Sequence, residues 1–180
     1  LHGANGYLIE QFLNPRANHR VDGYGKTPAG RMRFALEVAE AVANKIGADR
    51  TGMRLSPYGA SNDTGAFEGI DAFYTELCQK LSDLNLAYLH LVDHSAMGAP
   101  PVSAELKAQI RKIFKGVLIL SGGYDVNSAE HDLLEKKGDL IAFGRPFIAN
   151  PDLVSKFKDK IPLNPPDSNT FYTPGPEGYL

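Results

Sequence analysis

Four short apolar runs recur along the chain, and stretches with helical periodicity separate them. The runs lie at residues 51–56, 86–92, 116–121 and 139–144, and Gly, Pro, Ser or Asp closes each of them. None of them alternates strictly between apolar and polar residues. We therefore interpret the runs as strands of a parallel sheet that is buried on both faces.

The stretches between the runs carry apolar residues three and four positions apart, which predicts amphipathic helices. We expect helices at residues 30–46, 70–84, 103–114, 127–137 and 151–160. Gly47 is an expected helix stop and Ser103 an expected N-cap. Asn127 or Ser128 is expected to cap the fourth helix, and Pro151 to stand at the first position of the fifth.

Strand and helix alternate every 25–35 residues, which indicates right-handed βαβ units and an α/β fold. Four strands are too few for a closed eight-stranded barrel, which typically takes about 250 residues. On strand count alone, an open four-stranded parallel sheet of the doubly wound kind is possible. After Ile161 the chain becomes Pro-rich and contains Phe171, Tyr172 and Tyr179. We expect this tail to pack over another part of the fold.

Composition excludes several classes of protein. The 180 residues include 19 Lys and Arg against 21 Asp and Glu, so the chain has no excess of positive charge with which to bind nucleic acid. No apolar run approaches the roughly 20 residues of a membrane span. The single cysteine, Cys78, cannot form an internal disulfide, so we expect a cytoplasmic protein.

The first constellation of chemistry-bearing residues is His2-x-x-Asn5-x-Tyr7. A neutral imidazole and a carboxamide can both donate hydrogen bonds to one carbonyl oxygen or anion. A phenol two residues further on can supply a proton. The alternative is that His2 and Asn5 only cap the helix that follows.

Arg54 stands in the middle of an apolar strand, where a guanidinium needs an anionic or strongly accepting partner. The run at 51–56 contains no acidic residue. A bound ligand and a salt bridge to a distant carboxylate explain Arg54 equally well.

Glycine turns follow the third and fourth predicted strands, at Gly122-Gly123 and at Gly144-Arg145. Glycines at strand ends let backbone N–H groups approach a phosphate. Phosphate sites of barrels often use two consecutive loops of this kind. Neither turn has the Lys of a P-loop or the spacing of a dinucleotide fingerprint. The pattern therefore argues against a nucleoside triphosphate or an NAD bound in a Rossmann fold as the phosphate-bearing ligand.

His90, Asp93 and His94 could in principle bind a metal. Their side chains do not converge across a strand end, and no Cys or Glu completes the set. We therefore expect no metal site.

Longer motifs occur in order along the chain. They are His2-Gly-Ala-Asn5-Gly-Tyr7-Leu-Ile-Glu-Gln-Phe-Leu-Asn-Pro15, Asn18-x-Arg20-x-Asp22-x-Tyr24-Gly25, Gly52-Met-Arg54-Leu-Ser-Pro-Tyr-Gly59, Phe143-Gly144-Arg145-Pro-Phe-Ile-Ala-Asn150-Pro151-Asp-Leu153 and Phe171-Tyr172 with Glu177-Gly178-Tyr179. Together they resemble the old yellow enzyme family of FMN-dependent ene-reductases.

The resemblance implies a TIM (β/α)₈ barrel, of which this chain supplies the end of strand 4 and strands 5–8 with their helices. Residues 1–161 would form the second half of this FMN-binding barrel, and residues 162–180 a tail packed near the active site. Because strands 1–3 have no counterpart here, we expect a complementary N-terminal half-barrel, on another chain or segment, as partner. The sequence also departs from the family in the loop that follows Tyr24-Gly25. Family members usually carry Gly-Gly-Ser and then Glu-Asn-Arg there, whereas this chain reads Gly25-Lys-Thr-Pro-Ala-Gly-Arg31.

The resemblance further implies non-covalent FMN, reduced by NADPH, and reduction of the C=C bond of α,β-unsaturated carbonyl compounds. His2 and Asn5 would hold the substrate's carbonyl oxygen, and Tyr7 would protonate the α-carbon. Tyr172 would line the substrate pocket.

The cofactor-binding residues implied by the resemblance are Arg54, facing the flavin's N1 and O2 region, and a phosphate-holding set of four. That set is Gly122, Gly123, Gly144 and Arg145. Two alternatives stay open: another phosphate-binding barrel enzyme acting on phosphorylated sugars, and a non-catalytic half-barrel fragment.

Overall fold

A computed structural model describes residues 1–176 of the chain. The chain divides into two compact units, Leu1–Ile141 and Ala142–Leu180. The first unit contains almost all of the sheet and the helices that cover it, and the second contains two short helices and the Pro-rich tail.

One sheet runs through the strands in chain order, β1 to β5. The first four strands pair in parallel, as expected from the βαβ pattern. The short β1 lies outside the four apolar runs, although the resemblance implied the end of a strand at the start of the chain. The other four strands match the apolar runs in shortened form. The bounds are β1 His2–Gly3, β2 Gly52–Leu55, β3 Tyr88–Val92, β4 Val117–Ser121 and β5 Leu140–Ala142.

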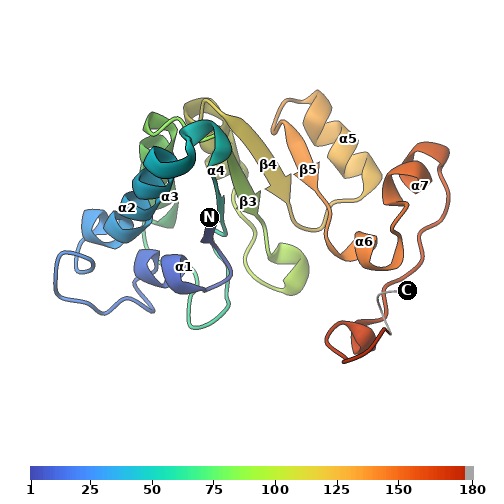
Figure 1. The fold of residues 1–180 in the computed structure, drawn as a ribbon, viewed down its shortest axis with the longest axis horizontal. Coiled ribbons are helices and arrows are strands. Elements are labelled where there is room, and N and C mark those ends of the chain that lie inside the picture. Colours follow the sequence, from blue (N-terminus) through green and yellow to red (C-terminus); the bar gives the residue numbers. More distant parts are fainter. Residues whose placement is uncertain (177–180) are drawn as a thin grey trace. The chain divides into compact units, whose positions relative to one another are not determined.

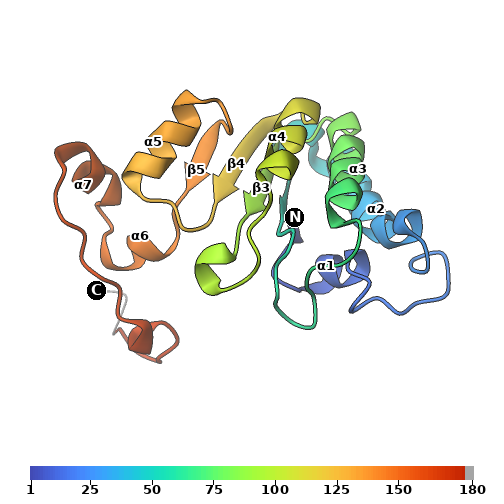
Figure 2. The same ribbon diagram turned by 180° about the vertical axis from the view of Figure 1, so that it is seen from behind.

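Helices join the strands, and α2, α3 and α4 follow one another along the same face of the sheet (Figures 1 and 2). All five predicted helices are present, with shifted ends. The short helices α1 and α6 were missed. The bounds are α1 Leu8–Leu13, α2 Pro28–Ile46, α3 Ile70–Asp83, α4 Ala104–Ile113, α5 Val126–Leu134, α6 Arg145–Ala149 and α7 Leu153–Asp159, with 3₁₀ turns at Ala48–Arg50, Ser95–Met97 and Ser168–Thr170.

Helix boundaries follow local capping chemistry. Ser103 caps α4 by accepting the Leu106 N–H, and Gly47 ends α2 with a φ of 102°, both as predicted. The α5 cap was placed wrongly on Asn127 or Ser128. Asp125 is the cap, because its carboxylate accepts the backbone N–H of Ser128, whose hydroxyl in turn accepts the N–H of Asp125.

The start of α7 was also misplaced. Pro151 lies in the turn before the helix, Asp152 is the N-cap and Leu153 the first helical residue. Proline fits both a turn and a helix start, so its presence alone does not distinguish the two.

The hydrophobic core lies between the helices and one face of the sheet. Alternate strand residues point into it, and each of them is at most 2% exposed: Met53, Leu55, Leu89, Leu91, Leu118 and Leu120. Helices α3 and α4 supply facing side chains such as Leu77 and Ile110. Cys78, on α3, is buried in this core.

The opposite face of the sheet, called here the open face, carries the intervening residues of β2, β3 and β4. Tyr88 and Val117 on this face are 38% and 39% exposed. The prediction of strands buried on both faces is therefore wrong for this chain by itself. The reason is geometric, because successive side chains alternate between the two faces and the helices cover only one of them.

The second unit is built around Asn150, whose side chain is fully buried. Its amide nitrogen donates to the carbonyls of Pro146 and Asn164, and its Oδ1 accepts from Lys156 Nζ and the Asn164 N–H. These four bonds tie α6, α7 and the start of the tail together.

Candidate functional site

His2 and Arg54 begin a row of polar side chains across the open face. His2 in β1 is the register partner of Arg54 in β2, and Arg54 is the partner of His90 in β3. Partners on neighbouring parallel strands project from the same face of a sheet. Partial burial, and then the charge of Arg54, lowers the pKa of His2, which favours the neutral imidazole expected from the sequence.

Asn5 and Tyr7 lie on the segment that joins β1 to α1. Tyr7 is the N-cap residue of α1, and no side chain caps that helix by a hydrogen bond. The alternative of His2 and Asn5 as helix caps is therefore wrong. The Tyr7 ring lies 5.2 Å from the His2 ring, between centroids, and the Tyr7 side chain is half exposed. The three residues predicted from the motif are thus neighbours at one end of the sheet.

Two polar atoms in this region are buried without a hydrogen-bond partner among the described residues: Asn5 Oδ1 and Arg54 Nε. Burial lowers the pKa of Arg54, and the negative charge of Glu10 opposes that effect. None of the salt bridges found between described residues involves Arg54. Of the two explanations left open by the sequence for Arg54, an accepting ligand fits its Nε better than an ion pair, whereas Asn5 Oδ1 would need a donor.

His90 takes part in the row in a way that the sequence did not reveal. Its Nε2 lies 2.9 Å from Ser121 Oγ on the neighbouring strand β4. Burial, followed by the charge of Arg54, lowers the pKa of His90 to about 4, so the ring is neutral near pH 7. The row therefore contains one guanidinium cation between two neutral imidazoles.

Asp93 lies at the same end of the sheet, just after β3, and protein groups bind its carboxylate. Its carboxylate accepts from Lys107 Nζ at 2.7 Å and from the backbone N–H groups of Ser95 and Val102. Within residues 1–176, no group of three His, Cys, Asp or Glu side chains is arranged to hold a metal ion.

Gly122 and Gly123 follow β4 in the left-handed region, with φ of 119° and 69°. A Cβ on Gly122 would overlap with the carbonyl oxygen of Asp93. Both positions therefore need glycine for backbone reasons. The Ser128 N–H at the start of α5 already donates to Asp125, so it is not an open phosphate donor.

Gly144 and Arg145 belong to the second unit, where Gly144 is the N-cap residue of α6 and Arg145 its first residue. Nothing lies within 4 Å of a Cβ built on Gly144. A phosphate site shared with Gly122 and Gly123 stays a prediction from the sequence.

Tyr172 is 97% exposed, and its one ring contact among the described residues is with Phe171, 6.5 Å away between centroids. A role in lining the substrate pocket stays a prediction. Glu177, Gly178 and Tyr179, which complete the tail motif, lie outside the described residues.

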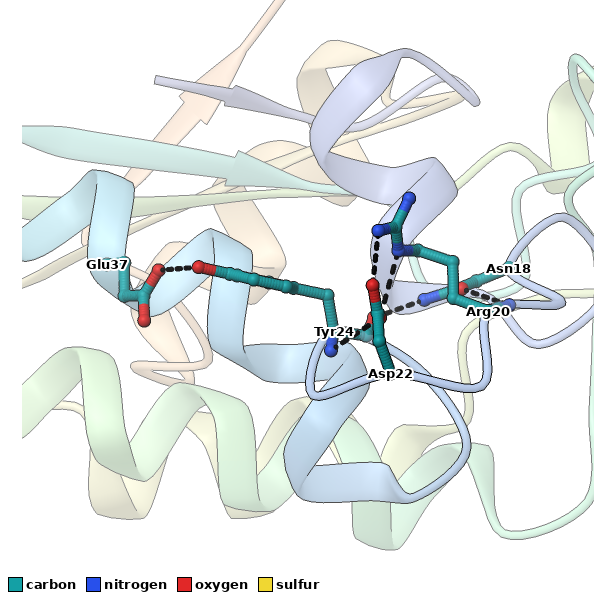
Figure 3. Close-up of polar contacts among 5 residues, drawn as sticks. All are labelled: Asn18, Arg20, Asp22, Tyr24 and Glu37. Atoms are coloured by element: carbon teal, nitrogen blue, oxygen red, sulfur yellow. Dashed lines mark hydrogen bonds and ion pairs between the residues drawn. The ribbon is translucent and has the colours of Figure 1, made fainter.

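The Asn18–Tyr24 motif is structural (Figure 3). Asn18 Oδ1 accepts the Arg20 N–H, Arg20 forms an ion pair with Asp22, and Asp22 Oδ1 accepts the Tyr24 N–H. The Tyr24 hydroxyl donates to Glu37 on α2 at 2.9 Å. These contacts connect the loop between α1 and α2 to α2, and none of them involves a residue of the polar row.

No described helix combines the length and apolar character needed to cross a membrane.

Comparison with known proteins shows the family to which the chain belongs. The family model of the NADH:flavin oxidoreductase / NADH oxidase family matches residues 1–164. A 12-oxophytodienoate reductase-like protein of Solanum lycopersicum is 42% identical over 173 residues, which cover 96% of this chain and 46% of that protein.

Solved structures give the same result. The old yellow enzyme homologue of Zymomonas mobilis superimposes with a TM-score of 0.92 at 38% identity, covering 99% of this chain and 50% of that one. Morphinone reductase gives a TM-score of 0.93 at 40% identity, covering 99% of this chain and 48% of that one. The chain spans about half the length of these relatives. It belongs to the NADH:flavin oxidoreductase / NADH oxidase family, and within it to the old yellow enzymes.

Proposed function

We propose that this chain carries the substrate-activating and proton-donating part of an FMN-dependent ene-reductase that uses NADPH. The observation that carries the proposal is the grouping of His2, Asn5, Tyr7 and Arg54 at one end of the sheet. Family membership supports FMN as the cofactor. NADPH as the reductant, and the location in the cytoplasm, rest on the sequence resemblance and expectation alone.

The residues present fit a flavin mononucleotide. Arg54 Nε is a buried donor with no partner among the described residues, as expected for a group that contacts the accepting N1 and O2 edge of the ring. The left-handed Gly122-Gly123 turn keeps the backbone free of side chains where a phosphate would approach. We propose the same phosphate contact for Gly144 and Arg145.

The remaining steps belong to residues of this chain. FMN, when bound and reduced, supplies the hydride for the β-carbon of the unsaturated carbonyl compound. His2 and Asn5 donate hydrogen bonds to the carbonyl oxygen, which stabilises the negative charge that develops there. Tyr7 transfers its phenolic proton to the α-carbon, so the C=C bond gains one hydride and one proton. Tyr172 is proposed to line the substrate pocket.

We also propose that the chain acts as the second half of a (β/α)₈ barrel, residues 1–161, with the tail 162–180 packed near the active site. The open face supports this, because Tyr88 and Val117 stay more than a third exposed there. A complementary half carrying the first strands would cover that face. A stable, monomeric, yellow preparation of this chain alone would contradict the need for a partner.

The test is co-expression of the chain with the first half of a solved family member, followed by an absorbance scan and anaerobic assays with NADPH and cyclohexenone. We expect a flavin spectrum and enone reduction. Tyr7→Phe should keep flavin reduction by NADPH and lose enone reduction. If both half-reactions proceed unchanged in Tyr7→Phe, the proton-donor role is wrong. Absence of a flavin spectrum in the assembled barrel would reject the cofactor.

A further inference from the structure

Side chains bind every backbone polar group of the Asn5-Gly6 dipeptide. The Asn5 N–H donates to Ser56 Oγ at 2.9 Å, and the Asn5 carbonyl accepts from Asn62 Nδ2 at 3.0 Å. The Gly6 N–H donates to Glu10 Oε2 at 2.6 Å, and the Gly6 carbonyl accepts from Gln11 Nε2 at 2.7 Å. Regular secondary structure supplies none of these partners, so the turn depends on its side-chain contacts.

The turn has a conformation that needs such support. Asn5 and Gly6 are consecutive left-handed residues, with φ of 60° and 69°. Only glycine adopts this region at no steric cost, so Asn5 is in a less favourable state. A Cβ on Gly6 would also overlap with the Ser61 carbonyl oxygen. This geometry sets the directions of the Asn5 carboxamide and of the Tyr7 ring next to it.

Glu10 connects the contacts on the N–H side of the turn. Its carboxylate is 1% exposed and accepts from three donors: the Gly6 N–H, the Ser56 hydroxyl and, at 3.4 Å, the Tyr74 hydroxyl. The Ser56 hydroxyl donates to Glu10 and its oxygen accepts the Asn5 N–H. One buried carboxylate thus orders both N–H groups of the dipeptide, one directly and one through Ser56.

We propose that Glu10 is a positioning residue that holds the Asn5–Gly6 turn, and with it the side chains of Asn5 and Tyr7, in a single conformation. Burial raises the pKa of Glu10, because removing the charged carboxylate from water is energetically unfavourable. Stability alone therefore gives little reason for a carboxylate at this position. The use of the turn in catalysis rests on the proposed function, but the positioning itself does not.

Glu10→Gln is the decisive substitution. The Gly6 N–H can only donate, whereas the Ser56 and Tyr74 hydroxyls can both donate and accept. Glu10→Gln replaces the charged acceptor of the Gly6 N–H with a neutral amide oxygen for which the two hydroxyls compete, although the side chain keeps its size. Glu37→Gln on α2 is the matched control, because Glu37 is exposed and has no contact with the turn.

The measurement is native-state amide hydrogen exchange on the full chain, with the Leu77 amide in α3 reporting the stability of the core. In Glu10→Gln we expect exchange at Gly6 to become about tenfold faster or more, with Leu77 changed much less. A general stabilising role would change Gly6 and Leu77 together and would overturn the proposal. Glu37→Gln should change neither amide.

Ser56→Ala provides a second test that keeps the carboxylate and does not depend on the fate of Glu10→Gln. It should speed exchange at Asn5 about tenfold, while Ser82→Ala, a buried serine that bonds the Lys115 N–H, should leave Asn5 unchanged. Unchanged exchange at Asn5 and Gly6 in Ser56→Ala would overturn the proposal. These readouts need neither flavin nor enone, so they stay valid if the proposed activity fails.

Discussion

His90 Nε2 and Ser121 Oγ meet at 2.9 Å across neighbouring strands, 31 residues apart in the sequence. The contact keeps a neutral imidazole on the open face beside the Arg54 cation. It links a residue first considered as a metal ligand to the strand that leads into the turn at Gly122. Burial of the same imidazole beside Arg54 makes the stability of the fold depend on pH in a defined window.

The first prediction concerns that window. The unfolded chain protonates His90 near pH 6.5, but the folded chain does so only near pH 4, because burial and then Arg54 lower the folded pKa. Stability from this residue is therefore present above pH 6.5 and is lost as the pH falls toward 4, by at most about 1.4 kcal/mol per pH unit. His90→Gln should flatten this slope in urea titrations.

The control for the first prediction is His19→Gln, which changes an exposed histidine on the loop after α1. It should keep the slope of the parent chain. An unaltered slope in His90→Gln would mean that other groups cause the pH dependence.

The second prediction concerns Asp93. Burial opposes its ionisation, but hydrogen bonds from Lys107 and Ser95 outweigh burial and lower the pKa of the carboxyl. Its contribution to stability is thus present above the unfolded pKa near 4 and is lost as the pH falls through the folded value. Asp93→Asn should lower the unfolding free energy at pH 7 by about 1–3 kcal/mol.

Asp22→Asn is the control for Asp93→Asn. It breaks a pair with Arg20 in which both side chains are about half exposed, and solvent screening leaves such pairs little effect on stability. Equal losses in the two variants, measured by urea unfolding, would contradict a special role for Asp93 in holding the segment from Ser95 to Val102.

Much of the fold could be predicted from the sequence because its information is local. Helix α2 is 19 residues long and ends at a glycine, so periodicity and a stop signal define it. Helix α1 was missed because its six residues are too few to display a period and no side chain caps it. The open face was missed because apolar runs do not tell which element covers each side of a strand.

Residues of the candidate site could be predicted where they stand close together in the sequence or differ clearly from their neighbours. His2, Asn5 and Tyr7 are close in sequence, and Arg54 is conspicuous among apolar neighbours. Glu10 was not predictable, because its partner Ser56 is 46 residues away and only strand register brings them together. In the sequence, Glu10 is indistinguishable from a polar residue on an exposed helix face.

The third prediction concerns the glycine turn. Gly122→Ala should lower the unfolding free energy by about 2 kcal/mol or more, because a left-handed φ and overlap with the Asp93 carbonyl both disfavour a Cβ. Gly144→Ala should stay within about 0.5 kcal/mol, since nothing lies within 4 Å of its added Cβ. Similar losses in the two variants by urea unfolding would contradict the assigned turn geometry.

The fourth prediction concerns Arg54, a half-buried cation without an ion pair among the described residues. Arg54→Met should leave the chain equally or more stable, because it removes a desolvated charge whose Nε has no partner. The same change should weaken flavin retention in the assembled barrel at least tenfold, while Arg33→Met on α2 should not. A destabilised Arg54→Met chain that still binds flavin normally would show that Arg54 serves the fold rather than the cofactor.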